Sequence, residues 1–161
     1  MKRNLIERPQ WLPRAALIAC IGFGSVALAA TPEITRIISN RQANLKEVGS
    51  EFKKINDQLK TEKPDLRAIG LAAQTIQRHA DELPTWFPKG SGTEAGVKTR
   101  AKAEIWTQAD AFTDAGRQFQ SEAAKLATTA AGSDLNALRA QAKATGEACG
   151  TCHKSFREKE S

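Results

Sequence analysis

Three residues near the C-terminal end of the 161-residue chain have the types and spacing of a cofactor-binding motif. Cys149 and Cys152 are separated by two residues, and His153 follows directly. In the pattern C-x-x-C-H, two thiols add across the haem vinyl groups and the adjacent imidazole ligates the iron. On a helix, positions i, i+3 and i+4 share one face. The motif therefore predicts one covalent haem c with His153 as axial ligand.

Two other uses of closely spaced cysteines fit the chain less well. A thioredoxin-like pair belongs at the start of a helix that follows a strand, whereas this pair lies near the end of a helix. A structural or catalytic disulfide remains the alternative in an oxidising compartment. A closed zinc site needs four ligands. After the N-terminal segment, the Cys and His residues are only the two cysteines, His153 and the distant His79, so a zinc site is not favoured.

The N-terminal 30 residues have the pattern of a secretory signal. Four basic residues precede an uncharged apolar run from Ala15 to small residues at Ala29 and Ala30. This run is shorter than the roughly 20 residues of a membrane-spanning helix. We therefore expect cleavage near Ala30, a mature domain of residues 31–161, no stable membrane insertion and a periplasmic location. Lipidation of Cys20 is the less favoured alternative, since few apolar residues precede it.

The charge balance gives no indication of a nucleic-acid partner. The full chain has a formal net charge of +6, but residues 1–30 contain four Lys/Arg and Glu7. The mature segment therefore has 20 basic and 17 acidic residues. A small positive excess without basic and aromatic clusters does not favour nucleic-acid binding.

The mature segment is predicted to be an all-α, antiparallel, up-down-up-down four-helix bundle. It is rich in helix-forming residues, contains no Tyr and has almost no period-two alternation. Apolar residues recur at helical spacing in four segments, 34–59, 66–83, 105–131 and 135–156. Thr31-Pro32 begins the first, and the second follows Lys63-Pro64-Asp65. Ser133 or Asp134 begins the fourth, and Arg157 and Lys159 are expected in its last turn. Short connections between successive amphipathic helices favour a bundle.

The chain resembles the class II cytochromes c, which comprise cytochrome c′ and its low-spin relatives. The resemblance covers the whole mature segment. It rests on the sequence from Ala148 to Arg157 around the haem motif, on the turn Leu83-Pro84…Phe87-Pro88-Lys89-Gly90-Ser91-Gly92, and on Glu104-Ile105-Trp106. It implies that Arg41 lies near the haem and that Leu45, four residues later, faces the iron. Low-spin relatives have Met there as sixth ligand, whereas cytochrome c′ has an apolar residue and five-coordinate iron.

The remaining candidates for the haem site are assigned as follows. The only methionine is Met1, so His/Met ligation is excluded once the signal is removed. His79 is the other candidate for a sixth iron ligand, but it is expected to be exposed to solvent instead. Arg41 is expected to pair with a haem propionate, with a solvated charge as the alternative. Phe156 is expected to touch haem, and Arg157 to lie close to it or to complement the helix end. The other aromatic residues are expected in the core: Phe52, Trp106, Phe112 and Phe119, with Trp86-Phe87 plugging the bundle end or forming a docking patch.

These assignments imply two functions that share one site. A haem in such a bundle can pass single electrons to redox partner proteins, or it can bind small diatomic gases such as nitric oxide and carbon monoxide beside Leu45. A low-spin electron carrier with an unrecognised sixth ligand is the alternative. No acid–base pair is evident at the distal side, so we expect no enzymatic activity. The resemblance also implies a possible homodimer that uses the first helix.

Overall fold

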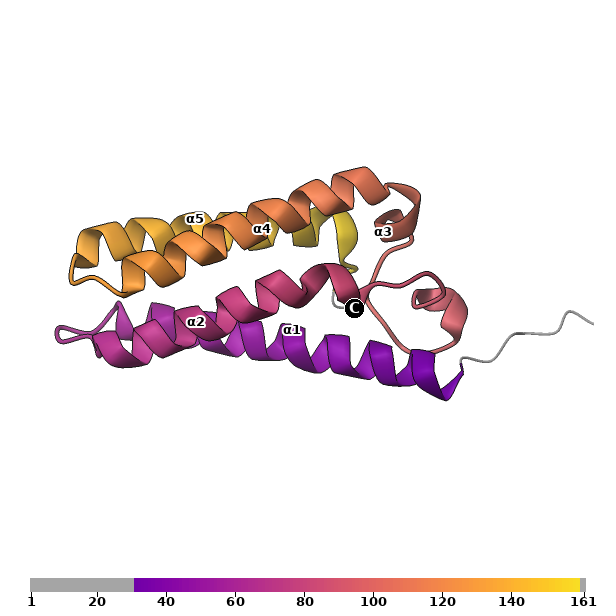
Figure 1. The fold of residues 1–161 in the computed structure, drawn as a ribbon, viewed down its shortest axis with the longest axis horizontal. Coiled ribbons are helices and arrows are strands. Elements are labelled where there is room, and N and C mark those ends of the chain that lie inside the picture. Colours follow the sequence, from indigo (N-terminus) through magenta and orange to yellow (C-terminus); the bar gives the residue numbers. More distant parts are fainter. Residues whose placement is uncertain (1–30, 160–161) are drawn as a thin grey trace, which may run out of the picture.

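The computed structural model describes residues 31–159, so the predicted signal segment, including Cys20, lies outside the described residues. Four long helices run antiparallel to their chain neighbours (Figure 1), which confirms the predicted all-α bundle. The elements are α1 (Pro32–Gln58), α2 (Leu66–Glu82), η1 (Leu83–Trp86), η2 (Thr93–Ala95), α3 (Glu104–Thr107), α4 (Ala109–Ala130) and α5 (Leu135–Phe156). None of the helices between residues 31 and 159 is long and apolar enough to cross a membrane.

Three of the long helices begin at side-chain caps, of which the sequence predicts Thr31 and, as one of two alternatives, Asp134. Thr31 Oγ1 accepts a hydrogen bond from the Ile34 amide at 3.3 Å, and Pro32 follows at the first helical position. Asp65 accepts from Ala68 N at 3.0 Å, and Asp134 accepts from Asn136 N and Ala137 N at 2.9 and 3.0 Å. These caps satisfy amides that have no partner inside the helix.

The predicted third and fourth helices differ from the structure at their ends. The single helix expected from Ile105 is divided into α3 and α4 at Gln108, whose φ of −121° and ψ of 51° are not helical. The fourth helix ends at Phe156, and Arg157 is extended, with φ −123° and ψ 130°. The segment before α3 supplies backbone partners there, since Lys102 N donates to Phe156 O and Glu158 N to Arg100 O. Arg157 and Lys159 therefore lie beyond the last turn.

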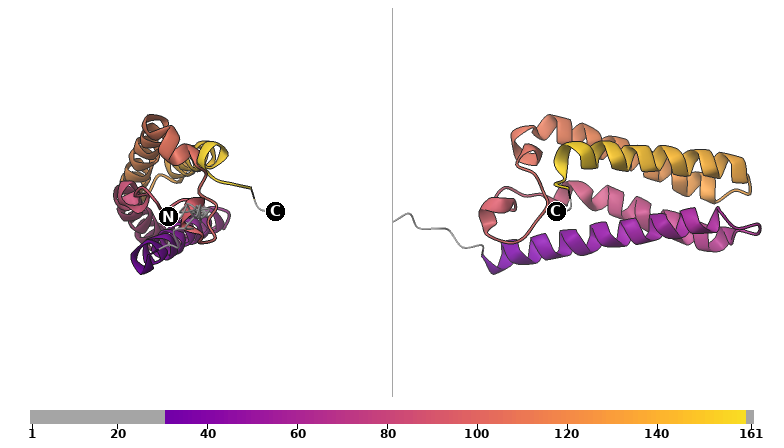
Figure 2. Two further views of the ribbon diagram at one scale, coloured as in Figure 1. Left: turned by 90° about the vertical axis from the view of Figure 1, so that its right-hand side faces the viewer. Right: turned by 180° about the vertical axis from the view of Figure 1, so that it is seen from behind.

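The four long helices pack in series, with α1 on α2, α2 on α4 and α4 on α5. The end-on view in Figure 2 shows this order around the bundle. Fully buried side chains of this core include Ile55, Ile69, Ile76, Ala123 and Leu126. The outer pair, α1 and α5, has only weak direct contact, with a groove of about 420 Å³ between the two helices near Phe52 and Gly146.

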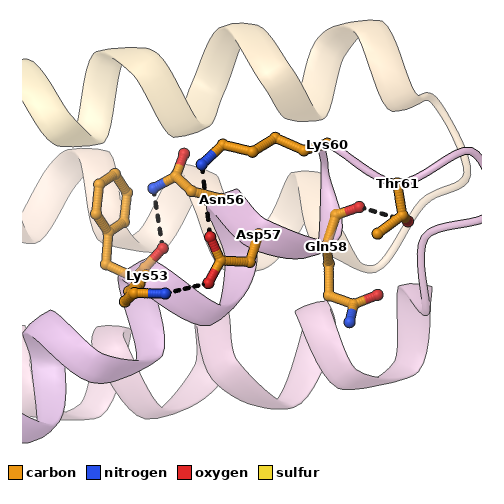
Figure 3. A network of polar contacts seen from close by, with 7 residues as sticks. Lys53, Asn56, Asp57, Gln58, Lys60 and Thr61 are labelled. Atoms are coloured by element: carbon orange, nitrogen blue, oxygen red, sulfur yellow. Dashed lines mark hydrogen bonds and ion pairs between the residues drawn. The ribbon is translucent and has the colours of Figure 1, made fainter.

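Local hydrogen bonds end α1 at the opposite end of the bundle from residues 149–153. Asn56 Nδ2 donates to the Phe52 carbonyl at 2.9 Å, and Thr61 Oγ1 donates to the Gln58 carbonyl at 2.8 Å. Figure 3 shows Asn56, Gln58 and Thr61 in this network at the end of α1. Lys53 and Lys60 both contact the carboxylate of Asp57. These contacts lower the pKa of this carboxyl, and the hydrogen bond from Lys53 is the largest cause. This end of the molecule is a structural turn, and the candidate site lies at the other end.

Candidate haem site

The C-x-x-C-H motif occupies the last two turns of α5. Cys149 and Cys152 are half-buried free thiols, and His153 is exposed. The helix is regular across the motif, and Thr151 Oγ1 donates to the Glu147 carbonyl at 2.9 Å. Since residues 149, 152 and 153 follow helical spacing, both thiols and the imidazole lie on one face of α5. In the part of the chain that the structure describes, no disulfide joins the two thiols.

The electrostatic surroundings of the motif favour its neutral forms. Burial raises the pKa of the Cys149 thiol to about 11, and the adjacent Cys152 adds to this effect. Burial likewise raises the pKa of Cys152. Partial desolvation of the ring, and then the positive charge of Arg100, lower the pKa of His153. A neutral imidazole has the free lone pair that iron ligation requires, so at neutral pH His153 is in the form that binds a metal.

Leu45 lies on the inward stripe of α1 but is only partly covered by protein. Seven residues before it and three after it, Ile38 and Val48 are buried, with exposed fractions of 0% and 8%. Leu45 itself is 37% exposed, and among the described residues the other exposed large apolar side chain is Leu71 on α2. An apolar side chain at a core register position with free surface is suited to contact a flat apolar group between α1 and α5.

Arg41 is buried, which rules out the alternative of a solvated charge. Its side chain belongs to a residue only 2% exposed, and both terminal nitrogens donate to the connection between α2 and α3. Nη1 donates to Trp86 O at 3.3 Å and Ser91 Oγ at 3.0 Å, and Nη2 to Ser91 O at 2.9 Å and Thr99 Oγ1 at 3.1 Å. The guanidinium also lies 4.6 Å from the Phe87 ring centroid. Arg41 therefore fixes this loop, and its pairing with a propionate stays a prediction.

The predicted aromatic core residues are buried or packed against the core. Phe119 and Phe156 are buried, and Phe52, Trp106 and Phe112 are partly buried against the two core clusters. Phe156 contacts Phe112 edge to face with centroids 5.2 Å apart, and Cys152 packs against the same cluster. Phe156 thus belongs to the cluster against which Cys152, a predicted site of haem attachment, packs. Arg157 is exposed in the extended segment beyond α5.

The connection after α2 closes the bundle end as predicted. Trp86 is buried and Phe87 is half-buried, so they plug the end rather than form an exposed docking patch. Trp106 Nε1 donates to the carbonyls of Phe87 and Pro88, both at 3.1 Å. The sequence predicts the aromatic plug but not the buried arginine network beside it, because a single charged residue on an apolar stripe has no distinctive spacing.

The expectation that His79 is exposed is wrong. His79 is 3% exposed, and its Nε2 lies 3.0 Å from Glu47 Oε2 on α1. The physical reason is its register on α2, three residues after the buried Ile76 and beside the buried Ala80. A carboxylate on the neighbouring helix makes this burial favourable. Nε2 of His79 is therefore occupied by the contact with Glu47.

A family model described as Cytochrome C′ matches residues 36–157. This chain belongs to the cytochrome c′ family. It is similar to cytochrome c′ of Rhodospirillum rubrum, with 33% identity over 158 residues that cover 98% of this chain and 99% of the relative. It is also similar to cytochrome c-554 of Cereibacter sphaeroides, with 32% identity over 144 residues that cover 86% of this chain and 94% of the relative.

Solved structures of the cytochrome c′ family have the same fold as residues 31–159. Cytochrome c′ from Thermochromatium tepidum matches with a TM-score of 0.74 and 26% identity, covering 78% of this chain and 97% of that chain. The nitric oxide complex of a leucine-to-alanine mutant of cytochrome c prime from Alcaligenes xylosoxidans matches with a TM-score of 0.71 and 25% identity, covering 79% and 97%. The four-helix architecture is therefore that of this family.

The cytochrome c′ family carries covalently attached haem c, and the residues of this chain fit that group. Two free thiols and an imidazole share one face of α5, and the thiols are half-buried beside apolar clusters. The exposed Leu45 supplies an apolar surface on the helix at the other side of the weakly packed α1–α5 pair. The donor set suits haem c, since thioether bonds need two cysteines and ligation needs one neutral histidine.

Proposed function

We propose that this chain is a periplasmic cytochrome c′ with five-coordinate, high-spin haem iron that binds nitric oxide or carbon monoxide at the face beside Leu45. The observation that carries the proposal is the exposed Leu45 at a core position of α1. Leucine has no atom that can ligate iron, and the chain contains no methionine after Met1. The sixth position is therefore left to an external small ligand.

The chain's residues contribute to gas binding by holding the haem and shaping its surroundings. Cys149 and Cys152 would attach one edge of the macrocycle to α5, and His153 would hold the iron from the same helix. The haem supplies the binding of a diatomic gas to iron. Leu45 would offer an apolar contact that admits small ligands and disfavours polar or bulky ones, because desolvating a polar molecule against leucine is unfavourable.

Electron transfer uses the same haem and is the second candidate function. A five-coordinate iron that gains or changes a ligand reorganises more than a six-coordinate one, which is a disadvantage for a dedicated carrier. We do not propose enzymatic activity. His79 is engaged with Glu47 between α1 and α2, so this pair is not available beside Leu45 as an acid and base for a bound peroxide.

The proposal is tested by optical absorption spectra of the purified protein, oxidised, reduced, and reduced with carbon monoxide or nitric oxide. A broad high-spin reduced spectrum that shifts when gas is added is the expected result. A sharp low-spin spectrum that is indifferent to gas would reject five-coordinate iron and favour the electron carrier with a sixth ligand. N-terminal sequencing of the protein from a periplasmic fraction tests export, with cleavage expected near Ala29 or Ala30.

A further inference from the structure

His79 lies between the carboxylates of two helices. Its Nε2 is 3.0 Å from Glu47 Oε2 on α1, and its Nδ1 is 3.6 Å from Glu82 Oε2 on α2. The contact between Nε2 and Glu47 Oε2 has the length of a hydrogen bond. Nδ1 is buried without a hydrogen-bond partner. The strongest polar interaction of this ring is therefore the one that joins α2 to α1.

The tie to Glu47 lies close to Leu45 along α1. Leu45 is two residues before Glu47 and four residues after Arg41, whose Nη1 donates to Trp86 O at 3.3 Å. The Trp86 ring meets the His79 ring edge to face, with centroids 5.7 Å apart. Leu45 therefore lies between two polar contacts of α1. Arg41 contacts Trp86 of η1, Glu47 contacts His79 of α2, and the rings of Trp86 and His79 touch. Since a helix is stiff over two turns, these contacts fix the rotation and height of Leu45.

Among the other contacts of α1 in this region, Gln42 Nε2 donates to Lys98 O at 2.8 Å, which joins α1 to the loop before α3 and not to α2. Apolar side chains such as Ile38 and Val48 are buried, but apolar packing is non-directional. The hydrogen bond between His79 Nε2 and Glu47 Oε2, in contrast, has a defined length and direction. Buried polar groups serve to specify one arrangement in some proteins even where apolar residues would give equal stability.

We propose that His79 and Glu47 are positioning residues that set how closely Leu45 approaches the gas-binding face of the haem. This inference rests on the proposed function, because it concerns access to the same face. Without the contact between His79 and Glu47, α1 shifts relative to α2 and the Leu45 side chain obstructs access to the iron less. Gas then binds faster, while the haem remains attached through α5.

The experiment measures carbon monoxide association with the reduced protein by stopped flow, for the wild type and for His79→Phe and Glu47→Ala. Each variant should bind carbon monoxide about threefold to tenfold faster, in line with the coupling found between neighbouring groups. His79→Gln should stay close to the wild-type rate, because its amide nitrogen can reach Glu47. The effect of His79→Phe should disappear in a Leu45→Ala background if it acts through Leu45.

Glu51→Ala is the matched control, since Glu51 lies one turn further along α1 and its carboxylate pairs with Lys54 on the same helix at 2.7 Å. Its carbon monoxide rate should equal that of the wild type. Variants at His79 and Glu47 that unfold at lower temperature but keep the wild-type rate would overturn the positioning role and leave the proposed function intact. A wild-type protein that binds no gas would instead overturn the proposed function and this inference together.

Discussion

At the scale of single residues, Leu45 and the C-x-x-C-H motif divide the chemistry between two helices. The motif residues on α5 can attach and ligate a haem, and Leu45 on α1 can only limit what approaches it. This division explains why one substitution on α1 should change the state of the iron without affecting covalent attachment. It also separates tests of the ligand from tests of the attachment.

The substitution Leu45→Met should convert the iron from high spin to low spin. A thioether at this position of α1 can ligate iron, as the resemblance to low-spin class II cytochromes c implies. Absorption spectra of the reduced protein, with and without carbon monoxide, measure the change. Leu45→Ile is the control and should stay high spin. An unchanged spectrum in Leu45→Met would show that Leu45 does not face the iron.

The double substitution Cys149→Ser with Cys152→Ser should abolish covalent haem. Serine oxygen does not form the thioether bonds that the two thiols supply. Haem staining after denaturing electrophoresis measures attachment, which should be lost completely. In this variant, residues 31–159 contain no cysteine that could bind haem covalently. If the haem stain persisted, the attachment would lie elsewhere in the chain and the assignment of the site would be refuted.

At the scale of elements, Arg41 connects α1 to the loop that precedes α3. Replacing it with leucine removes the donors for Trp86 O, Ser91 and Thr99. Buried acceptors without donors are unfavourable, so Arg41→Leu should lower the free energy of unfolding by about 2–4 kcal/mol. Urea denaturation measures this. Arg36→Ala, which removes an exposed pair with Glu33 within α1, should have little effect, and equal losses would contradict the buried network.

Glu122 joins α4 to α5 and gives the bundle a pH dependence in the acid range. It pairs with Lys125 at 2.8 Å and accepts from Gln141 Nε2 at 2.6 Å, and these hydrogen bonds lower the pKa of its carboxyl. A carboxyl whose pKa is lower in the folded state stabilises the fold above its unfolded pKa. That contribution is lost as the pH falls through the folded pKa.

The substitution Glu122→Gln should therefore reduce stability at pH 7 and have little effect at pH 3. The difference between the denaturation midpoints of wild type and variant measures the contribution at each pH. Glu147→Gln is the control, since Glu147 faces Lys143 on its own helix at 3.8 Å. A Glu122→Gln difference of the same size at both values would show that the interhelical bond does not depend on ionisation.

At the scale of the whole molecule, the helices pack in series and the outer pair is weakly joined. α1 packs mainly on α2 and the η1 turn, whereas α2 and α4 each pack between two long helices. A haem between α1 and α5 would complete the ring of contacts. Local opening is most frequent where few apolar contacts hold an element.

Hydrogen exchange should consequently show the importance of haem for α1. In the haem-free Cys149→Ser, Cys152→Ser variant, amides of α1 should exchange faster than those of α2 and α4. In the wild type with haem, the exchange rates of the α1 amides should be closer to those of the α2 and α4 amides. Mass spectrometry of peptides from each helix measures this. Uniform loss of protection across all helices would show that haem supports the whole bundle and not α1 in particular.

The predicted homodimer also belongs to this scale and stays a prediction. Among residues 31–159, the large apolar side chains classed as exposed are Leu45 and Leu71, on different helices. Leu45 is already assigned to the haem face. Apart from Leu45, the described surface of α1 therefore has no exposed large apolar side chain that could pack against a second copy of the chain.

The sequence by itself determined the haem motif, the helical class and the cap at Thr31, and it left Ser133 and Asp134 as alternatives for the cap of the fourth helix. These features depend on spacing of a few residues along the chain, where covalent geometry and local hydrogen bonds decide the outcome. The resemblance added Arg41 and Leu45. Tertiary structure decided the rest, because burial depends on what packs against a residue. His79 is buried since Glu47 meets it from α1, Arg41 is buried since the loop at 86–99 surrounds it, and Arg157 is extended since residues 100–102 pair with the chain after Phe156.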